Sequence, residues 1–135
     1  MAALCRDENG NYLGSSAVFY EGVIDPTVLE TFSCREGLAL AEDLDVHDVV
    51  LASDCEGVVN DINWGTSGPN AAITHEIIAR SSGFSSCKFI FERRNFNLEV
   101  HNLAKYAYNL GIGRDVWLDN PHNPTIVPMN MCLNQ

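Results

Sequence analysis

The stretch VHDVVLASD, residues 46–54, holds the compact apolar run Val49–Ala52 and ends in an aspartate. A short run of branched apolar residues without polar alternation is typical of a strand buried on both faces, so we expect a strand over 46–53. Asp54 then lies where this strand ends. Because ligands of α/β sheets usually bind at the carboxyl ends of the strands, Asp54 is a candidate functional residue.

A long helix is predicted just before this strand. Asp25 and Pro26 are typical of an N-cap and a first helical residue, and apolar residues recur near helical spacing as far as Leu44. We therefore expect a helix over 26–44 with Glu30 in its first turn. Four acidic residues are expected on its solvated face, namely Glu36, Glu42, Asp43 and Asp45.

The N-terminal segment reads as a hairpin. Asn9-Gly10 is a strong turn signal because both residues tolerate a positive φ, and apolar residues flank it on both sides. We expect strands over 2–6 and 12–20. Gly14, Ser15 and Ser16 weaken the second pattern, which favours a bulge or an edge position for that strand.

Further elements are expected after Asp54. The pattern predicts helices over 55–64 and 70–82, a strand over 87–93, and a helix over 97–110 capped by Asn97. Residues 117–135 hold three of the five prolines, so we expect a domain over 1–110 and an extended or loosely docked tail over 111–135. The order of elements predicts a mixed α/β fold.

Composition limits the function. A chain of 135 residues with 46% hydrophobic and 19% charged residues supports one domain. We expect no membrane-spanning segment, and no secretory signal is readable in the first residues. We expect an intracellular protein whose five scattered cysteines are free thiols, mostly in the core. The formal net charge of −10 is opposite to the basic field of nucleic-acid binders, so any nucleic-acid role must be local or bridged by metal.

Three positions of this layout could converge on one site. They are Glu30, Asp54, and the pair Asn97 and His101, which lie four residues apart on one helix face. Paired carboxylates suit Mg²⁺, a hard cation that binds carboxylate and phosphate oxygens together. Structural interpretations stand beside this one. The helix dipole favours a first-turn Glu30, an aspartate such as Asp54 can cap the next helix, and His101 can be an ordinary helix histidine.

Five stretches of the chain together resemble a known family, the ribonuclease H-like domains of plant genomes, which are related to the RNase H part of non-LTR retrotransposon reverse transcriptases. Each stretch is modest alone, but they keep the family's order from about Leu4 to Ala107. They are Leu4–Gly10, Leu29-Glu30 with Cys34–Ala41, Leu51–Cys55, Arg94 with Asn97, and His101 with Leu103–Lys105.

The resemblance implies an RNase H-like fold, a mixed sheet flanked by helices, and cleavage of the RNA strand of RNA–DNA hybrids with Mg²⁺ or Mn²⁺. By position, Glu30 and Asp54 match metal-binding carboxylates of the family. His101 falls where the classical enzymes carry their last aspartate. Asn97 matches a structural or substrate-contacting asparagine, and Arg94 is a candidate phosphate contact.

One departure from the family pattern matters most. The family's first strand carries a metal-binding aspartate, but here Met1 falls almost on the second strand. We therefore expect a copy truncated at its N-terminus, with impaired hydrolysis, whose strand over 46–53 keeps an open edge or pairs with the N-terminal segment. The alternative is a non-catalytic remnant or protein-interaction module with the same fold. Trp64 and Trp117 could stack on bases, although packing in the core or tail is favoured.

Overall fold

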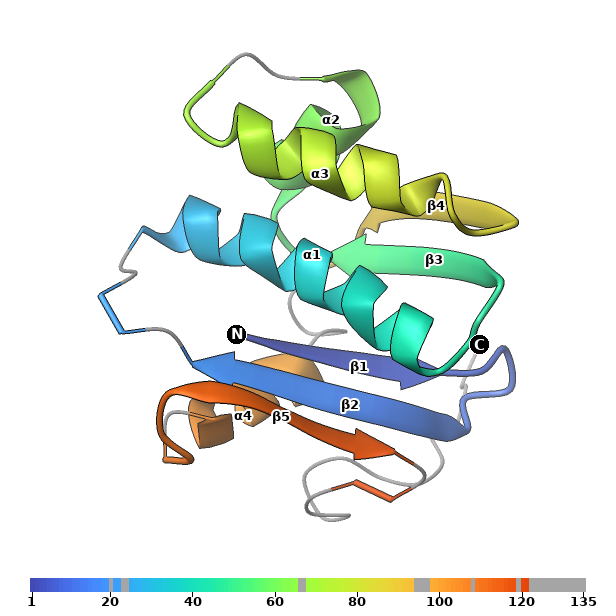
Figure 1. Cartoon of the computed structure of the whole chain (residues 1–135), viewed down its shortest axis with the longest axis vertical. Coiled ribbons are helices and arrows are strands. Elements are labelled where there is room, and N and C mark those ends of the chain that lie inside the picture. The colour runs from blue at the N-terminus through green and yellow to red at the C-terminus, as the bar shows by residue number, and fades with distance from the viewer. Residues whose placement is uncertain are drawn as a thin grey trace.

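The computed structural model describes residues 1–19, 21–22, 25–65, 68–93, 98–107, 109–118 and 120–121, except for the side chains of residues 101 and 107. The described strands form two sheets (Figure 1). In the first sheet β2 lies between β1 and β5 and is antiparallel to both, whereas β3 and β4 form a parallel pair. The elements are β1 (Ala2–Arg6), β2 (Tyr12–Phe19), α1 (Pro26–Asp43), β3 (Asp48–Ser53), α2 (Glu56–Trp64), α3 (Ala71–Ser81), β4 (Ser86–Phe91), α4 (Leu98–Ala107) and β5 (Gly113–Leu118).

The turn between β1 and β2 forms where the Asn9-Gly10 pair predicted it. Gly10 has a φ of 84°, in the left-handed region that glycine adopts at little cost. The Asp7 carboxylate accepts hydrogen bonds from the backbone N–H groups of Asn9 and Asn11, each at 2.9 Å. This local network fixes the turn, and the predicted hairpin is confirmed.

Strand β2 carries a bulge near its start. Cys5 pairs with Gly14 and Arg6 with Tyr12, so the register passes over Leu13. The irregularity expected in this strand is therefore real. The alternative expectation, an edge position, is wrong, because β5 pairs with the other side of β2.

Strand β5 was missed by the sequence analysis, which expected a tail over 111–135. Its six residues, Gly113–Leu118, pair with β2, and the Arg114 guanidinium binds Glu36 of α1 at 2.6 Å and Asp43 at 2.7 Å. A short run containing Arg114 and Asp115 gives no clear strand pattern, because the contacts that order it are remote in sequence. The rest of the expected tail, residues 122–135, lies outside the described residues.

Helix α1 begins as predicted. The Asp25 carboxylate accepts hydrogen bonds from the N–H groups of Thr27 at 2.8 Å and Val28 at 3.3 Å, and Pro26 is the first helical residue. The placement of Glu30 in the first turn is wrong, because that turn contains no acidic residue. Glu30 is the fifth residue of the helix, so the helix dipole at its N-terminus does not account for this position.

Helix α1 packs across one face of the two sheets and touches β1, β2 and β3, and it also contacts α2 and α3 (Figure 1). Little of its surface remains for solvent. Glu36, expected on the solvated face, is only 9% exposed and pairs with Arg114. That expectation is wrong because β5, which supplies the arginine, was not foreseen.

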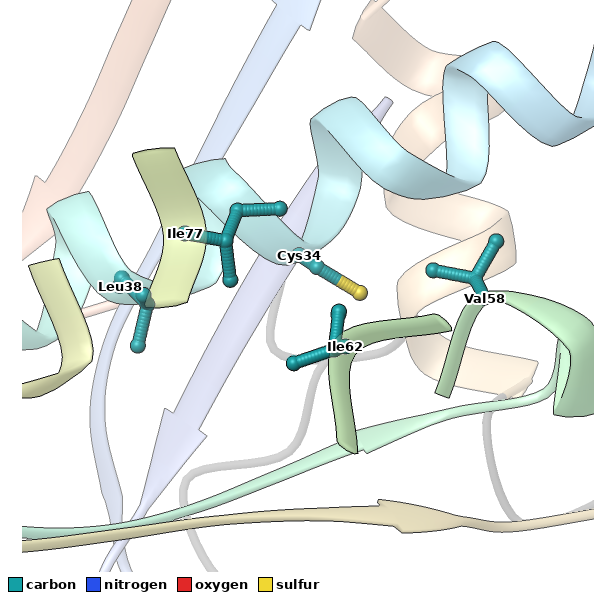
Figure 2. Close-up of a cluster of buried hydrophobic side chains, with 5 residues drawn as sticks. All are labelled: Cys34, Leu38, Val58, Ile62 and Ile77. Atoms are coloured by element: carbon teal, nitrogen blue, oxygen red, sulfur yellow. The ribbon is translucent and has the colours of Figure 1, made fainter. Parts of the chain in front are cut away.

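A hydrophobic cluster joins α1 to the two helices that follow β3 (Figure 2). Figure 2 shows Cys34 and Leu38 of α1 facing Ile62 of α2 and Ile77 of α3, with Val58 alongside. Partly buried side chains of β3 and β4 pack against this cluster, among them Leu51, Cys87 and Phe89. The other face of this sheet leaves Val50 64% exposed and Ile90 43% exposed.

A second cluster lies between α4 and the first sheet. Leu103 is fully buried against Ala2 and Ala17, and Val100, Ala104 and Trp117 pack around it. In Figure 1, α4 covers the face of this sheet opposite to α1. Among the described residues, no helix is both long and apolar enough to span a bilayer.

Two side-chain expectations need correction. Packing was favoured for both tryptophans, but only Trp117 packs in this way, whereas Trp64 at the end of α2 is 85% exposed. The cysteines of the described residues are free thiols, as expected. They are not mostly core, however, since Cys34 is buried while Cys5, Cys55 and Cys87 are half-buried.

Candidate functional site

The carboxyl end of β3 is held in place through Ser53. The buried Ser53 hydroxyl accepts a hydrogen bond from the N–H group of Cys55 at 3.2 Å, and the Ser53 carbonyl accepts one from the N–H group of Glu92 at 2.9 Å. The chain therefore turns from β3 into α2 along a fixed path. Asp54 is the residue at this turn.

Glu30 reaches the same place from α1. Its Oε2 atom lies 3.5 Å from the Ser53 Oγ atom, and both Glu30 and Asp54 are half-buried. The N-cap position of α2 is occupied by Cys55, so Asp54 precedes the helix cap and does not occupy it. Glu30 thus contacts the residue next to Asp54, at the sheet edge where the sequence placed the site. The roles of both carboxylates as metal ligands stay predictions.

The negative charge of Glu30 acts on two neighbouring groups that are partly or fully buried. Burial raises the pKa of the Cys34 thiol to about 12, and the charge of Glu30 adds to this shift. Burial lowers the pKa of the Met1 ammonium group, while the charges of Glu30 and Glu36 raise it. Glu30 thus places a negative charge close to the Cys34 thiol and the Met1 ammonium group.

Glu92 is a neighbour that the sequence analysis did not select. It follows β4 directly, and together with Glu30 and Ser53 it lines a groove of about 690 Å³ between the two sheets. Burial raises the pKa of the Glu92 carboxyl group. Its position was available as a signal, because parallel strands end at the same sheet edge and Glu92 follows β4 as Asp54 follows β3.

The remaining predicted site residues are not placed by the structure. Arg94 and Asn97 lie outside the described residues, and so does the expected cap of α4. His101 belongs to α4, but its side chain is also outside the description. The convergence of Asn97 and His101 with the two carboxylates stays a prediction.

The donor chemistry of this edge fits one hard divalent cation. Carboxylate oxygens are the ligands that Mg²⁺ prefers, and Mg²⁺ is commonly held by one or two carboxylates while it keeps several waters. Within the part of the chain that the structure describes, no group of three or more His, Cys, Asp and Glu side chains is placed to hold a metal ion. Glu30 and Asp54 carry oxygen donors of the kind that such a cation takes.

Comparison with solved structures shows the fold. The chain is similar to the N-terminal RNase H domain of Rv2228c from Mycobacterium tuberculosis, solved as a fusion with maltose-binding protein, with a TM-score of 0.61 and 19% identity over 81% of this chain and 91% of that one. It is also similar to RNase H1 from the halophilic archaeon Halobacterium salinarum NRC-1, with a TM-score of 0.55 and 18% identity over 82% and 97%. The expected RNase H-like mixed α/β fold is confirmed.

Comparison by sequence shows the family. No curated protein matches the chain. The sequence model of the reverse transcriptase-like family, in contrast, matches residues 1–107, from β1 to the end of α4. This match spans most of the chain, and the chain belongs to the reverse transcriptase-like family.

Proposed function

We propose that this chain is an RNase H-type nucleic-acid-binding domain that holds RNA–DNA hybrids through a divalent cation at the carboxyl end of β3. The observation that carries the proposal is the contact between Glu30 and Ser53, which brings one candidate carboxylate beside the residue preceding the other. The family match and the RNase H-like fold support the nucleic-acid class of substrate. The finer resemblance to plant and retrotransposon domains, and an intracellular location, are parts of this proposal.

Each residue has a distinct role in it. Glu30 and Asp54 supply oxygen ligands for Mg²⁺ or Mn²⁺, and the half-buried setting of both strengthens their attraction for a cation. When bound, such a cation supplies Lewis-acid chemistry at a phosphodiester. Ser53 positions Glu30 and fixes the turn that carries Asp54. By resemblance to the family, the proposal also gives substrate-binding or catalytic roles to three further residues, Arg94, Asn97 and His101.

The same proposal predicts weak hydrolysis. Two carboxylates hold one cation incompletely, whereas two-metal hydrolysis needs ligands that position both ions. By resemblance, His101 stands where the classical enzymes carry a carboxylate. We therefore expect the chain to bind a hybrid more readily than it cleaves it, with cleavage orders of magnitude below that of a complete two-metal site.

The test measures binding of a fluorescently labelled RNA–DNA hybrid by anisotropy, with Mg²⁺ and with EDTA. Asp54→Asn and Glu30→Gln should each remove the Mg²⁺-dependent part of the affinity. Asp115→Asn, the same change at an exposed carboxylate on β5, is the matched control and should leave affinity unchanged. Hybrid binding that ignores Mg²⁺, or that Asp54→Asn leaves intact, would contradict the proposal.

Cleavage of the same hybrid in Mg²⁺ and in Mn²⁺ completes the test. Robust cleavage abolished by Asp54→Asn would show that these ligands suffice and would overturn the prediction of weak hydrolysis. Cleavage that Asp54→Asn does not change would come from a contaminating nuclease and would count against a role for this site.

A second candidate function is a non-catalytic interaction module. The observation that favours it is the groove of about 690 Å³ between the two sheets, which is lined by both β1 and β3. A protein that retains a peptide partner while hybrid binding is absent in Mg²⁺ would support this candidate over the first.

A further inference from the structure

Helix α1 contains a glycine that its backbone does not require. Gly37 lies in the interior of this 18-residue helix, and its φ is not one of the positive values found at other glycines of the described residues. Any residue can adopt its conformation. After proline, glycine is the residue that favours a helix least, so the stability of the helix alone would favour alanine here. The space around Gly37 explains the glycine instead.

Gly37 lets Leu51 of β3 approach the backbone of α1. A Cβ atom at position 37 would lie 2.8 Å from the Cδ1 atom of Leu51 and 3.5 Å from its Cγ atom. The shorter distance is well below the separation of about 3.5–4.0 Å at which carbon atoms pack. Helix and strand therefore meet more closely at this point than any side chain at position 37 would allow.

A side chain at position 37 would displace the helix and not the leucine. Leu51 packs against the buried cluster shown in Figure 2, which contains Cys34 and Leu38 of α1. Because a close-packed interior offers few voids for a turned side chain, Leu51 has little freedom to move away. A small shift of α1, in contrast, spreads over many contacts.

The same two elements meet again at the candidate site. Glu30 and Gly37 are seven residues apart, which places them on one face of α1. Leu51 and Ser53 are two residues apart, which places them on one face of β3. The Glu30 Oε2 atom lies 3.5 Å from the Ser53 Oγ atom. The contact at Gly37 and the contact at Glu30 thus belong to a single interface between α1 and β3.

The C-terminal part of α1 is fixed to the first sheet. Arg114 of β5 binds Glu36 at 2.6 Å and Asp43 at 2.7 Å. A side chain at position 37 would therefore tilt the helix about this end and move its N-terminal part away from β3. Because Glu30 lies about twice as far from Asp43 along the axis as Gly37 does, the displacement would be roughly twice as large at Glu30.

We propose that Gly37 is a positioning residue for the candidate cation site. It leaves room for Leu51, and α1 then lies close enough to β3 for Glu30 to reach the residue next to Asp54. The inference rests on the proposed function, in which Glu30 and Asp54 bind Mg²⁺ or Mn²⁺. A glycine has no side chain to offer a cation, so Gly37 acts through the position of Glu30.

The test compares two glycine-to-alanine variants, with Mn²⁺ alone as the probe. Gly37→Ala should bind Mn²⁺ about tenfold more weakly than the parent, because one ligand is displaced. Its urea midpoint should change little, since alanine favours the helix and offsets the new steric overlap. Gly57→Ala in α2 is the matched control, because a Cβ atom there would meet no heavy atom of its surroundings within 4 Å. It should keep the parent's Mn²⁺ affinity. Electron paramagnetic resonance of free Mn²⁺ measures the affinity.

A change on the strand should restore the site. Leu51→Val removes the Cδ1 atom that the new Cβ atom would meet, so the double variant Gly37→Ala/Leu51→Val should recover most of the lost Mn²⁺ affinity. A general loss of helix packing would not be repaired in this way. If Gly37→Ala does not fold, the double variant should fold and bind Mn²⁺ like the parent, and its failure to fold would overturn the proposal.

Metal-free crystal structures separate this inference from the proposed function. In Gly37→Ala the Glu30 Oε2 atom should lie clearly farther from the Ser53 Oγ atom than the present 3.5 Å, and the double variant should restore the contact. A parent protein that does not bind Mn²⁺ would contradict the proposed function, while these structures would still decide whether Gly37 positions Glu30. With a parent that binds Mn²⁺, unchanged affinity of Gly37→Ala would overturn the inference. An unchanged Glu30 position, or a loss of affinity that Leu51→Val does not restore, would do the same.

Discussion

At the scale of single residues, the sequence predicted where a residue lies along a helix or strand better than it predicted which side chains surround that residue. Asp54 could be placed at a strand end from the run before it, and the structure has β3 ending at Ser53. Glu36 could not be assigned correctly, because its burial depends on Arg114, which is remote in sequence. Glu92 was overlooked for a related reason. Glu92 lies at the same sheet edge as Asp54 because β3 and β4 pair in parallel. The sequence pattern of a single strand does not reveal that pairing.

The first prediction at this scale concerns Cys34 and pH. Burial raises the pKa of this thiol from its ordinary value of 9.0 to about 12. Between these values the unfolded chain releases the proton and the folded chain keeps it, so the unfolded state binds fewer protons and stability falls as pH rises. Below pH 9 the contribution is fully present. The Cys34→Ala variant lacks this thiol and its contribution to stability. When the pH rises from about 8 to about 10, the free energy of unfolding of the variant should therefore fall by about 1 kcal/mol less than that of the parent.

Urea unfolding at both pH values measures this difference. Each protein is compared with itself, which removes the packing cost of the substitution. The pKa values of Cys5 and Cys87 are also raised by burial, but these thiols remain in both proteins and cancel. Equal losses of stability in the two proteins would show that Cys34 titrates as an exposed thiol.

At the scale of elements, the sequence predicted those helices, strands and turns whose own residues favour them. The Asp25-Pro26 start of α1 and the Asn9-Gly10 turn carry their own chemistry, and both formed as expected. Helices and strands from β3 to α4 were found with boundaries shifted by at most three residues. Strand β5 has no such signal. Its order comes from pairing with β2, from the Tyr12 hydroxyl, which donates to the Trp117 carbonyl at 2.9 Å, and from the ion pairs of Arg114.

The second prediction tests whether β5 belongs to the folded domain. A chain ending at residue 112 should be less stable than one ending at residue 121 by more than about 3 kcal/mol, because it leaves Glu36 buried without Arg114 and opens the edge of β2. Such a loss is a large share of the 5–15 kcal/mol that stabilises an ordinary domain. Urea unfolding followed by far-UV circular dichroism measures it. The same urea midpoint for both chains would place β5 outside the cooperative unit.

At the scale of the whole molecule, charge limits how this domain meets a polyanion. Eighteen acidic residues oppose eight basic ones, and four of the described arginines form ion pairs. Arg6 pairs with Glu99, Arg35 with Glu76, Arg80 with Glu42, and Arg114 with Glu36. These four arginines thus join elements of the fold to one another. Because these four arginines are already paired with carboxylates, we expect a bound cation to supply much of the attraction for phosphate.

The last prediction follows from that limit. A basic nucleic-acid-binding protein loses affinity as salt rises, because binding releases counterions from the phosphates. This chain, with a net charge of −10, should show the opposite trend in EDTA, since salt screens its repulsion from the hybrid and leaves few ion pairs to weaken. Adding Mg²⁺ at constant ionic strength should raise the affinity, and Asp54→Asn should remove that gain while preserving the salt trend in EDTA. Anisotropy titrations of a labelled hybrid between about 0.02 and 0.2 M NaCl measure both effects. A steep fall of affinity with salt in EDTA would instead reveal a basic binding surface, and the cation at β3 would then not be the main source of attraction.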